Sequence, residues 1–354
     1  MKKFIKKIVL LLPILIILIL TNYFVDPGNI FYKHGFYERG VAAIISSGKN
    51  VENLANYDER LLQKFYIDKL KKEKELVILG SSRAMQISSD IVSEKNMFNS
   101  SVSGASLEDL IAIYGIYREQ NVLPKKIILG LDPWMMNRGN NQTRWKSLED
   151  YYLYILNEVG ILDKKKDLIQ EKYLELVSLS YFQNAIDELK KGESVDYTAT
   201  DLKYSKTNVK LADGSLTYNE EFRKRSVEEV RKIAVSYASS KPIYNLGGFS
   251  KIDEQYKREF EEFINLIQKD GVEVEFYFSP YHPFVYKTLM DSSDYRIVNE
   301  VEKYFTKFAI DKKINIRGSY NPEKVNCSEE DFYDGMHIKP EGVMKIYNTK
   351  TVDG

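Results

Sequence analysis

The sequence contains few of the residues that build disulfide frameworks and transition-metal sites. Its 354 residues include one cysteine, Cys327, and three histidines. A single cysteine excludes an internal disulfide and any site of clustered cysteines, and three scattered histidines are too few for a histidine-rich metal site. A site made of carboxylates alone stays open. We therefore expect no cofactor and no metal centre of the cysteine or histidine type.

The chain also lacks a charge imbalance. Lysine plus arginine and aspartate plus glutamate both number 51, so the net charge is zero. No basic stripe of the kind that nucleic-acid binding requires stands out, and we expect no nucleic-acid partner. Apolar residues make up 44% and charged residues 29% of the chain, which is typical of a globular protein. The length suits one large core, or a core with an inserted subdomain.

An apolar run near the N-terminus predicts a membrane anchor. Lysines at positions 2, 3, 6 and 7 precede the run Ile8–Val25, whose length is close to the ~20 residues of a membrane-spanning helix. By the positive-inside rule, the N-terminus lies in the cytoplasm and everything after the run lies outside. No small-x-small cleavage site follows, so residues 1–27 are expected to form an uncleaved, single-pass signal anchor in the cell membrane. A free secreted form is the alternative.

Apolar runs and helical patterns alternate on either side of a long middle segment. The apolar runs Leu76–Leu79 and Ile127–Leu131 are typical of buried strands. Alternating apolar residues within Val272–Phe278 predict a further strand. The apolar spacing within 107–114 and 256–267 is typical of helices packed against a sheet. This order predicts an α/β fold with an open parallel sheet and helices on both faces.

The alternation stops between residues 135 and 250, a segment far longer than the roughly 2–6 residues of an ordinary connection in such folds. We interpret 135–250 as a large, mostly helical insertion that forms a cap or a substrate-binding segment. Residues 28–74 are expected to form a helical stalk or lead-in. The catalytic domain is then expected to combine 75–134 with 251–354.

Two distant polar motifs predict a catalytic serine, histidine and aspartate. Gly80-Ser81-Ser82 directly follows the first strand, and sites in open α/β sheets lie at the carboxyl ends of strands. Near the C-terminus, Asp334 stands three residues before His337. On a loop, this spacing lets the carboxylate bind one imidazole nitrogen and leaves the other free to act as a base. An ordinary turn with a helix-capping serine is the alternative for the first motif, and the combination of both motifs favours catalysis.

These motifs resemble those of the SGNH (GDSL-like) hydrolase superfamily. That resemblance implies a flavodoxin-like three-layer α/β/α fold, Ser82 as the nucleophile, and Asp334 and His337 as its partners. The second motif of the family contributes a glycine whose N–H enters the oxyanion hole, and Gly104 in Ser103-Gly104-Ala105 matches it. The resemblance therefore implies an oxyanion hole that includes the backbone N–H groups of Ser82 and Gly104.

The third motif departs from the family pattern. SGNH proteins have Gly-x-Asn-Asp at this strand end, and the asparagine donates to the oxyanion. Here the strand ends in Gly130-Leu131-Asp132. An ionised carboxylate cannot donate a hydrogen bond and repels an oxyanion. Asp132 is therefore expected to be protonated, to orient another group or to bind the substrate, and Asn137 is an alternative donor.

Further side chains near these motifs are candidates for substrate binding. Arg83 follows the nucleophile and pairs either with an anionic substrate or with a carboxylate of the surrounding protein. His282 follows a predicted strand and either contacts the substrate or forms a structural turn. Aromatic residues after the third motif are candidates for stacking on a sugar ring or for the core: Trp134, Trp145, Tyr151 and Tyr152.

The overall layout resembles membrane-anchored acyl-transfer proteins of bacterial envelopes. It is similar to the teichoic-acid D-alanylation protein (DltD type) and to SGNH-like exopolysaccharide acetyltransferases, which work beside a membrane-bound O-acyltransferase. The resemblance implies an extracytoplasmic O-acyltransferase that passes an acetyl or D-alanyl group from acyl-Ser82 to an envelope polysaccharide or teichoic acid. An anchored carbohydrate or lipid esterase and a non-catalytic envelope scaffold are the alternatives.

Overall fold

The centre of the protein is a sheet of five parallel strands. The computed structural model describes residues 2–28, 30–31, 35–161, 173–191 and 197–348. The strands of the central sheet are β2 (Leu76–Leu79), β3 (Met97–Asn99), β4 (Lys126–Gly130), β8 (Glu273–Phe278) and β9 (Asn315–Gly318). Their spatial order is β3-β2-β4-β8-β9, and every neighbouring pair is parallel. The expected α/β class with a parallel sheet is confirmed.

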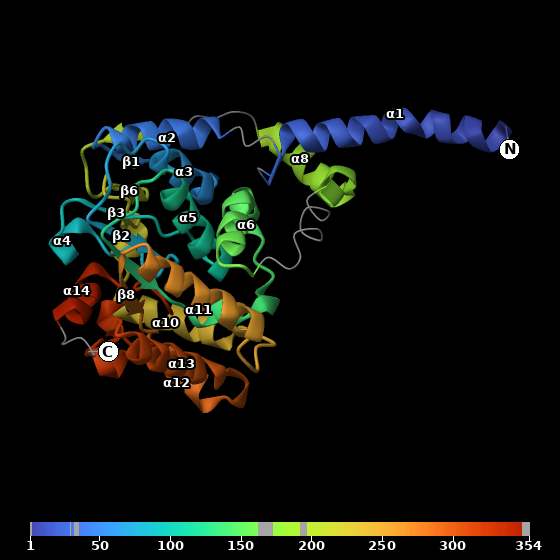
Figure 1. Ribbon diagram of the computed structural model, residues 1–354. Helices are drawn as coiled ribbons and strands as arrows, with labels where there is room; N and C mark the ends of the chain where they lie inside the picture. Colours follow the sequence, from blue (N-terminus) through green and yellow to red (C-terminus); the bar gives the residue numbers. More distant parts are fainter. Residues whose placement is uncertain (1, 29, 32–34, 162–172, 192–196, 349–354) are drawn as a thin grey trace.

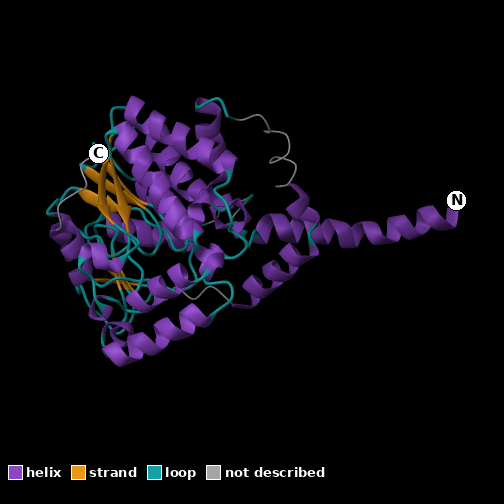
Figure 2. Cartoon of the chain, turned by 90° about the horizontal axis from the view of Figure 1, so that it is seen from below, coloured by secondary structure: helices purple, strands orange, loops and turns teal. Residues whose placement is uncertain are grey.

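Helices cover both faces of this sheet (Figure 2). On one face, Val77 and Ile127 belong to an apolar cluster shared with α5 (Leu107–Glu119), α11 (Glu254–Lys269) and α13 (Ile297–Lys312). On the other face, Ile78 and Ile128 belong to a second cluster shared with α14 (Pro340–Asn348). Successive strand side chains point to opposite faces, so a strand covered on both sides reads as a continuous apolar run.

The lead-in segment packs onto the body of the protein and contains a strand. It comprises α2 (Phe36–Ser46), β1 (Asn50–Glu52) and α3 (Glu59–Ile67). The apolar residues of α2 and α3, such as Val41 and Leu61, are fully buried in the first cluster. The lead-in therefore differs from a stalk, because both of its helices contribute to the main core.

A second, antiparallel sheet joins the lead-in to the insertion. Its strands run in the order β5-β1-β6-β7, with β5 (Thr198–Thr200), β6 (Val209–Lys210) and β7 (Leu216–Thr217) supplied by the insertion. These strands have two or three residues each, too few to give a recognisable alternation of apolar and polar residues. The sequence therefore predicted a helical lead-in and missed this sheet.

The insertion is otherwise helical. Between β4 and α11 it contains η1 (Pro133–Met136), η2 (Arg138–Asn140), η3 (Arg144–Leu148), α6 (Glu149–Glu158), η4 (Glu175–Val177), α8 (Leu179–Lys191), α9 (Glu220–Arg223), α10 (Val227–Ser239) and η5 (Tyr244–Leu246). The remaining elements are α4 (Ser89–Val92), α12 (Pro283–Asp291), η6 (Ser293–Tyr295), η7 (Pro322–Val325) and η8 (Glu329–Asp331).

The N-terminal helix α1 (Lys2–Val25) projects from the body, and α8 and η4 lie beside its base (Figure 1). Among the described residues, no helix combines the length and the apolar character that a membrane crossing requires.

Candidate active site

Ser82, His337 and Asp334 form a continuous hydrogen-bonded chain at the carboxyl end of β2. Ser82 Oγ lies 2.9 Å from His337 Nε2, and His337 Nδ1 lies 2.8 Å from Asp334 Oδ2. In this arrangement the imidazole can accept the serine proton while the carboxylate holds the opposite nitrogen. All three residues are partly exposed, so a substrate can reach the serine. The structure thus brings together the three predicted catalytic residues.

The turn that carries Ser82 depends on close packing between two strand ends. Ser82 begins a turn after β2, in which Ala84 N–H donates to the Ser81 carbonyl. A Cβ on Gly80 would lie 2.9 Å from Ala84 Cβ and 3.2 Å from Gly130 Cα. Only glycine fits here without a shift of the strands. The glycine of the first motif therefore lets the Ser82 turn pack against the end of β4.

The loop that carries His337 is fixed by Asp334 itself. Asp334 Oδ1 accepts the backbone N–H groups of Met336 and His337, each at 2.8 Å. Burial opposes ionisation of Asp334, but His337 and these two N–H groups hold the pKa of the carboxyl below its usual value. Asp334 is therefore ionised at neutral pH, and it favours the His337 tautomer that carries its proton on Nδ1.

Arg83 and Asp132 form a buried ion pair behind the nucleophile. Arg83 Nη1 lies 2.6 Å from Asp132 Oδ1, and the two residues are 1% and 2% exposed. The guanidinium also donates to the carbonyls of Ser279 and Met336. It therefore links the ends of β2, β4 and β8 to the loop before His337.

This pair bears on the alternatives for both residues. Arg83 makes a salt bridge with the protein, and Asp132 orients Arg83. Burial raises the pKa of Asp132, and the neighbouring Arg83 opposes that rise. Both side chains are enclosed by the protein. Substrate contacts by Arg83 and Asp132 stay predictions.

Two backbone donors are free for an oxyanion. Within the described part of the chain, the N–H groups of Ser82 and Gly104 have no hydrogen-bond acceptor. Gly104 has a φ of 54°, and a Cβ there would lie 2.5 Å from Arg144 Nη2 and 2.6 Å from Tyr244 Oη. Arg144 and Tyr244 therefore bring two more polar groups to this glycine, and no sequence pattern predicted either of them.

Asn137 lies in the 3-10 turns that follow β4. It is buried, and its Oδ1 accepts the N–H of Gly139 at 3.1 Å. Its role as an oxyanion donor stays a prediction.

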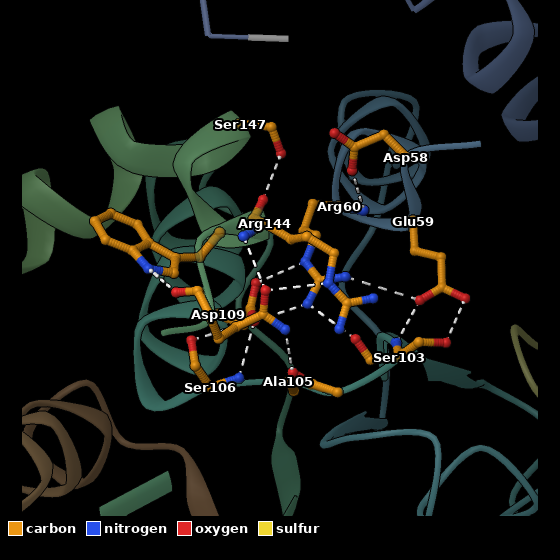
Figure 3. Close-up of polar contacts among 12 residues, drawn as sticks. Asp58, Glu59, Arg60, Ser103, Ala105, Ser106, Asp109, Arg144 and Ser147 are labelled. Atoms are coloured by element: carbon orange, nitrogen blue, oxygen red, sulfur yellow. Dashed lines mark hydrogen bonds and ion pairs between the residues drawn. The ribbon is translucent and has the colours of Figure 1, made fainter. Parts of the chain in front are cut away.

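The Gly104 loop is held by charged residues of the lead-in helix α3 (Figure 3). Arg60 binds both carboxylate oxygens of Asp109 at 2.9 Å and the Ser103 carbonyl at 3.1 Å. Glu59 accepts the backbone N–H and the hydroxyl of Ser103. The lead-in thus fixes the residue directly before Gly104. The positions of Glu59 and Arg60 in the sequence did not predict their contact with Ser103, because the contact joins segments that are distant in the sequence.

Two predicted substrate contacts lie inside the protein. His282 is fully buried, its Nδ1 accepts the N–H of Phe284, and its own N–H donates to the Gly335 carbonyl. This matches the alternative of a structural turn, and it braces the loop next to Asp334. Trp134 is 1% exposed and donates from Nε1 to the Ala105 carbonyl at 2.9 Å. The aromatic residues Trp145 and Tyr152 are also buried.

The insertion instead brings other aromatic residues close to His337. The Tyr218 ring lies 5.7 Å from the His337 ring, and Phe222 lies 4.8 Å from Tyr218. The Arg225 guanidinium lies 4.0 Å from the centre of the Phe222 ring. Tyr218 and Phe222 are partly exposed. Sequence reasoning missed them, because they belong to a short segment without helical or strand periodicity.

A family model with the description "protein of unknown function (DUF1574)" matches residues 4–346. The chain belongs to the DUF1574 family. No curated protein matches it significantly. The DUF1574 match includes the N-terminal helix, the lead-in, the insertion and all three residues of the hydrogen-bonded chain. In the part of the chain that the structure describes, no group of three or more His, Cys, Asp or Glu residues is arranged to hold a metal ion.

Proposed function

We propose that this DUF1574 protein is a membrane-attached serine acyltransferase of the SGNH type that acts on a cell-envelope polymer. The observation that carries the proposal is the hydrogen-bonded chain from Ser82 through His337 to Asp334. The parallel sheet with both faces covered supports the finer assignment to a flavodoxin-like α/β/α fold. The position of the serine, which follows a strand at its carboxyl end, also supports it.

The chemistry follows from the positions of these groups. Ser82 Oγ attacks the carbonyl carbon of an acyl donor while His337 Nε2 takes the serine proton and then gives it to the leaving group. Asp334 stabilises the imidazolium that forms. A hydroxyl of the acceptor next attacks acyl-Ser82, His337 takes its proton, and the ester bond to Ser82 breaks. The acyl group ends on the acceptor and the proton returns to Ser82.

The oxyanion hole needs a replacement for the missing asparagine. The N–H groups of Ser82 and Gly104 supply two donors, and loss of a further one costs roughly 2.7–4 kcal/mol in other enzymes. Asp132 does not fill the role, because its carboxylate binds Arg83. Arg144 and Tyr244, which lie beside Gly104, are the side chains that we propose as further donors, with Asn137 as the alternative.

The setting of the reaction rests on the N-terminal segment and on the insertion. We assign the lysines and the apolar run of residues 2–25 to a single-pass anchor with the catalytic domain outside the cell. A membrane-bound O-acyltransferase would then supply the acyl group, acetyl or D-alanyl. Tyr218 and Phe222, beside His337, are placed to contact an acceptor sugar of an envelope polysaccharide or teichoic acid, since ring faces stack well on apolar sugar faces.

An esterase is the second candidate, and one observation favours it. Ser82 and His337 are both partly exposed, so water reaches the same acyl-serine that a sugar would attack. Transfer requires that an acceptor displaces this water. The two activities share the first half-reaction and differ only in the second.

Intact mass spectrometry of the full chain after exposure to an activated acetyl ester tests the proposal. The wild type is expected to gain one acetyl group at Ser82, and Ser82→Ala is expected to gain none. Ser239→Ala removes an exposed hydroxyl on α10 and serves as the control that keeps the adduct. Added oligosaccharides should become acetylated if the protein is a transferase, whereas release of acetate alone indicates an esterase. Absence of an adduct and of ester turnover in the wild type contradicts both candidates.

A further inference from the structure

One face of α1 is occupied by a second segment of the chain. Leu18 and Asn22 are four residues apart, so they lie on one side of the helix, and Asp26 follows directly after the helix ends at Val25. They are only 8%, 0% and 2% exposed. The elements in contact with α1 are η4 and α8 (Figure 1). We refer to residues 173–191, which contain both elements, as the 173–191 segment.

Specific polar contacts fix the 173–191 segment to the helix. Asn22 Nδ2 lies 3.0 Å from each of three acceptors, the backbone carbonyls of Glu175, Leu176 and Ser178. The Tyr181 hydroxyl donates to Asp26 Oδ1 at 2.6 Å. The backbone carbonyls at the end of η4 thus receive hydrogen bonds from a side chain of α1. These bonds give the attachment a defined register, which a general apolar contact would not.

The attachment begins alongside the apolar run. Leu18 is seven residues before the end of the helix at Val25, which corresponds to about 11 Å along an α-helix. Both Leu18 and Asn22 fall inside Ile8–Val25, the run that we assign to the membrane. The 173–191 segment therefore accompanies the last turns of this run, at the depth where the hydrocarbon core meets the headgroups.

The exposed surface of the 173–191 segment includes several large apolar side chains. Its exposed large side chains are Tyr173 at 59%, Leu174 at 63%, Val177 at 47%, Leu179 at 74% and Leu189 at 62%. Side chains of α1 at the same level, including Tyr23 and Phe24, are also exposed. Isolated exposed leucines are common on soluble proteins, but five large exposed apolar side chains within one short segment are typical of an interaction site.

We propose that the 173–191 segment is an interfacial element that docks on the outer leaflet of the lipid bilayer beside α1. Lipid is the occupant that the observations favour, because the segment that exposes these apolar side chains packs against α1, whose apolar run we assign to the membrane. Tyrosines also gather where this run ends, with Tyr23 packed on Phe31 and Phe31 packed on Tyr181, and tyrosine is enriched at membrane interfaces. The inference rests on the proposed membrane attachment and not on the proposed acyl transfer.

This second contact has a consequence for the catalytic body. A body held by a single helix can rotate about the helix axis, whereas a body with two adjacent contacts has a fixed orientation. The insertion that provides Tyr218 beside His337 also provides the 173–191 segment. Docking would therefore hold the active site at a constant height and rotation relative to the membrane.

Lipid quenching of single-site fluorophores tests the proposal. The full chain carries one native cysteine, Cys327, which is buried and whose thiol pKa is raised by burial to about 12, so it resists labelling. Leu174→Cys and Leu179→Cys are labelled with the fluorophore NBD and reconstituted into phosphatidylcholine–phosphatidylglycerol vesicles. Leu202→Cys and Ile310→Cys, at positions that are 57% and 49% exposed, are the matched controls. Equal thermal unfolding midpoints verify that all four variants fold.

Probes at 174 and 179 are expected to lose at least about half of their emission to headgroup-proximal doxyl lipids, because an interfacial segment buries its apolar face at that depth. Probes at 202 and 310 are expected to keep theirs. Unquenched emission at all four positions overturns the proposal, since it means that the segment does not contact lipid. Equal quenching at all four positions also overturns it, since it means general adsorption of the protein to the vesicles. Repeating the labels on Ser82→Ala separates this result from the chemistry, because quenching does not depend on an acyl adduct.

Discussion

The ion pair between Arg83 and Asp132 gives a quantitative test of how the site is held together. Arg83→Met keeps the length of the apolar stem and removes the charge, and Asp132→Asn removes the other charge. Both residues are almost fully buried, so each single change leaves one buried charge without its partner and should cost about 3–5 kcal/mol of unfolding free energy. The double variant leaves no unpaired charge.

The double variant should therefore be more stable than the sum of the single changes predicts. Its remaining loss comes from the carbonyls of Ser279 and Met336, which lose their donor, and should be about 1–3 kcal/mol for each orphaned group. We expect a coupling energy of about 3 kcal/mol or more from the double-mutant cycle. Such a value distinguishes a buried pair from an exposed one, for which about 0–1 kcal/mol is typical.

Urea unfolding of the full chain in detergent micelles, followed by tryptophan fluorescence, measures these energies. Trp134 is buried and lies 5.9 Å from the Arg83 guanidinium, so it reports on this region directly. The rate of acetyl-adduct formation should fall in Arg83→Met as well, because the Met336 carbonyl precedes His337 in the chain. A coupling energy below about 1 kcal/mol would refute the reasoning, since the pair would then behave as solvent-exposed.

Three further changes test other parts of the site and the core. Asp334→Asn should slow adduct formation by about ten-thousand-fold in stopped-flow assays, because the amide no longer selects the His337 tautomer. Little stability should be lost. Gly104→Ala should lower the free energy of unfolding by about 1–2 kcal/mol, because it places a side chain at positive φ, and by more because the new Cβ meets Arg144 and Tyr244. Adduct formation should fall as well, and a fully active variant would exclude Gly104 from the oxyanion hole. Burial raises the pKa of Glu108, which accepts a hydrogen bond from Tyr256, from 4.5 to about 7. Its protonated form therefore stabilises the fold below pH 4.5, and about 3 kcal/mol of this is lost as the pH rises through 7; Glu108→Gln should abolish this loss in urea titrations at pH 5 and pH 8, and an unchanged pH dependence would contradict the burial argument.

Local patterns were sufficient to predict the elements that build the sheet. Leu76–Leu79 is recognisable as a strand, because a parallel strand that is buried on both faces needs a continuous apolar run. Val272–Phe278 is recognisable by its alternating apolar positions. Ser82 and the Asp334–His337 pair could be singled out for a similar reason. The motif that follows a strand and the spacing within one loop are both properties of a short stretch of chain.

Contacts between distant segments were beyond the reach of these patterns. The lead-in was expected to be helical, but its strand β1 forms a sheet with strands of the insertion. Glu59 and Arg60 fix the Gly104 loop, and Tyr218 lies beside His337. None of these residues has a distinctive neighbour in the sequence, so their roles depend on how the chain folds back on itself.

The sequence by itself determined the class of fold, the strand-end serine and the Asp-x-x-His spacing, since each follows from periodicity or from a few adjacent residues. Only the tertiary structure decided the partner of Asp132. From the sequence, the carboxylate of Asp132 stands where the family pattern has an oxyanion donor. The structure shows instead that it forms an ion pair with Arg83, 2.6 Å away. The physical reason is that the state of a buried charge depends on the groups around it in space, which the order of residues along the chain does not specify.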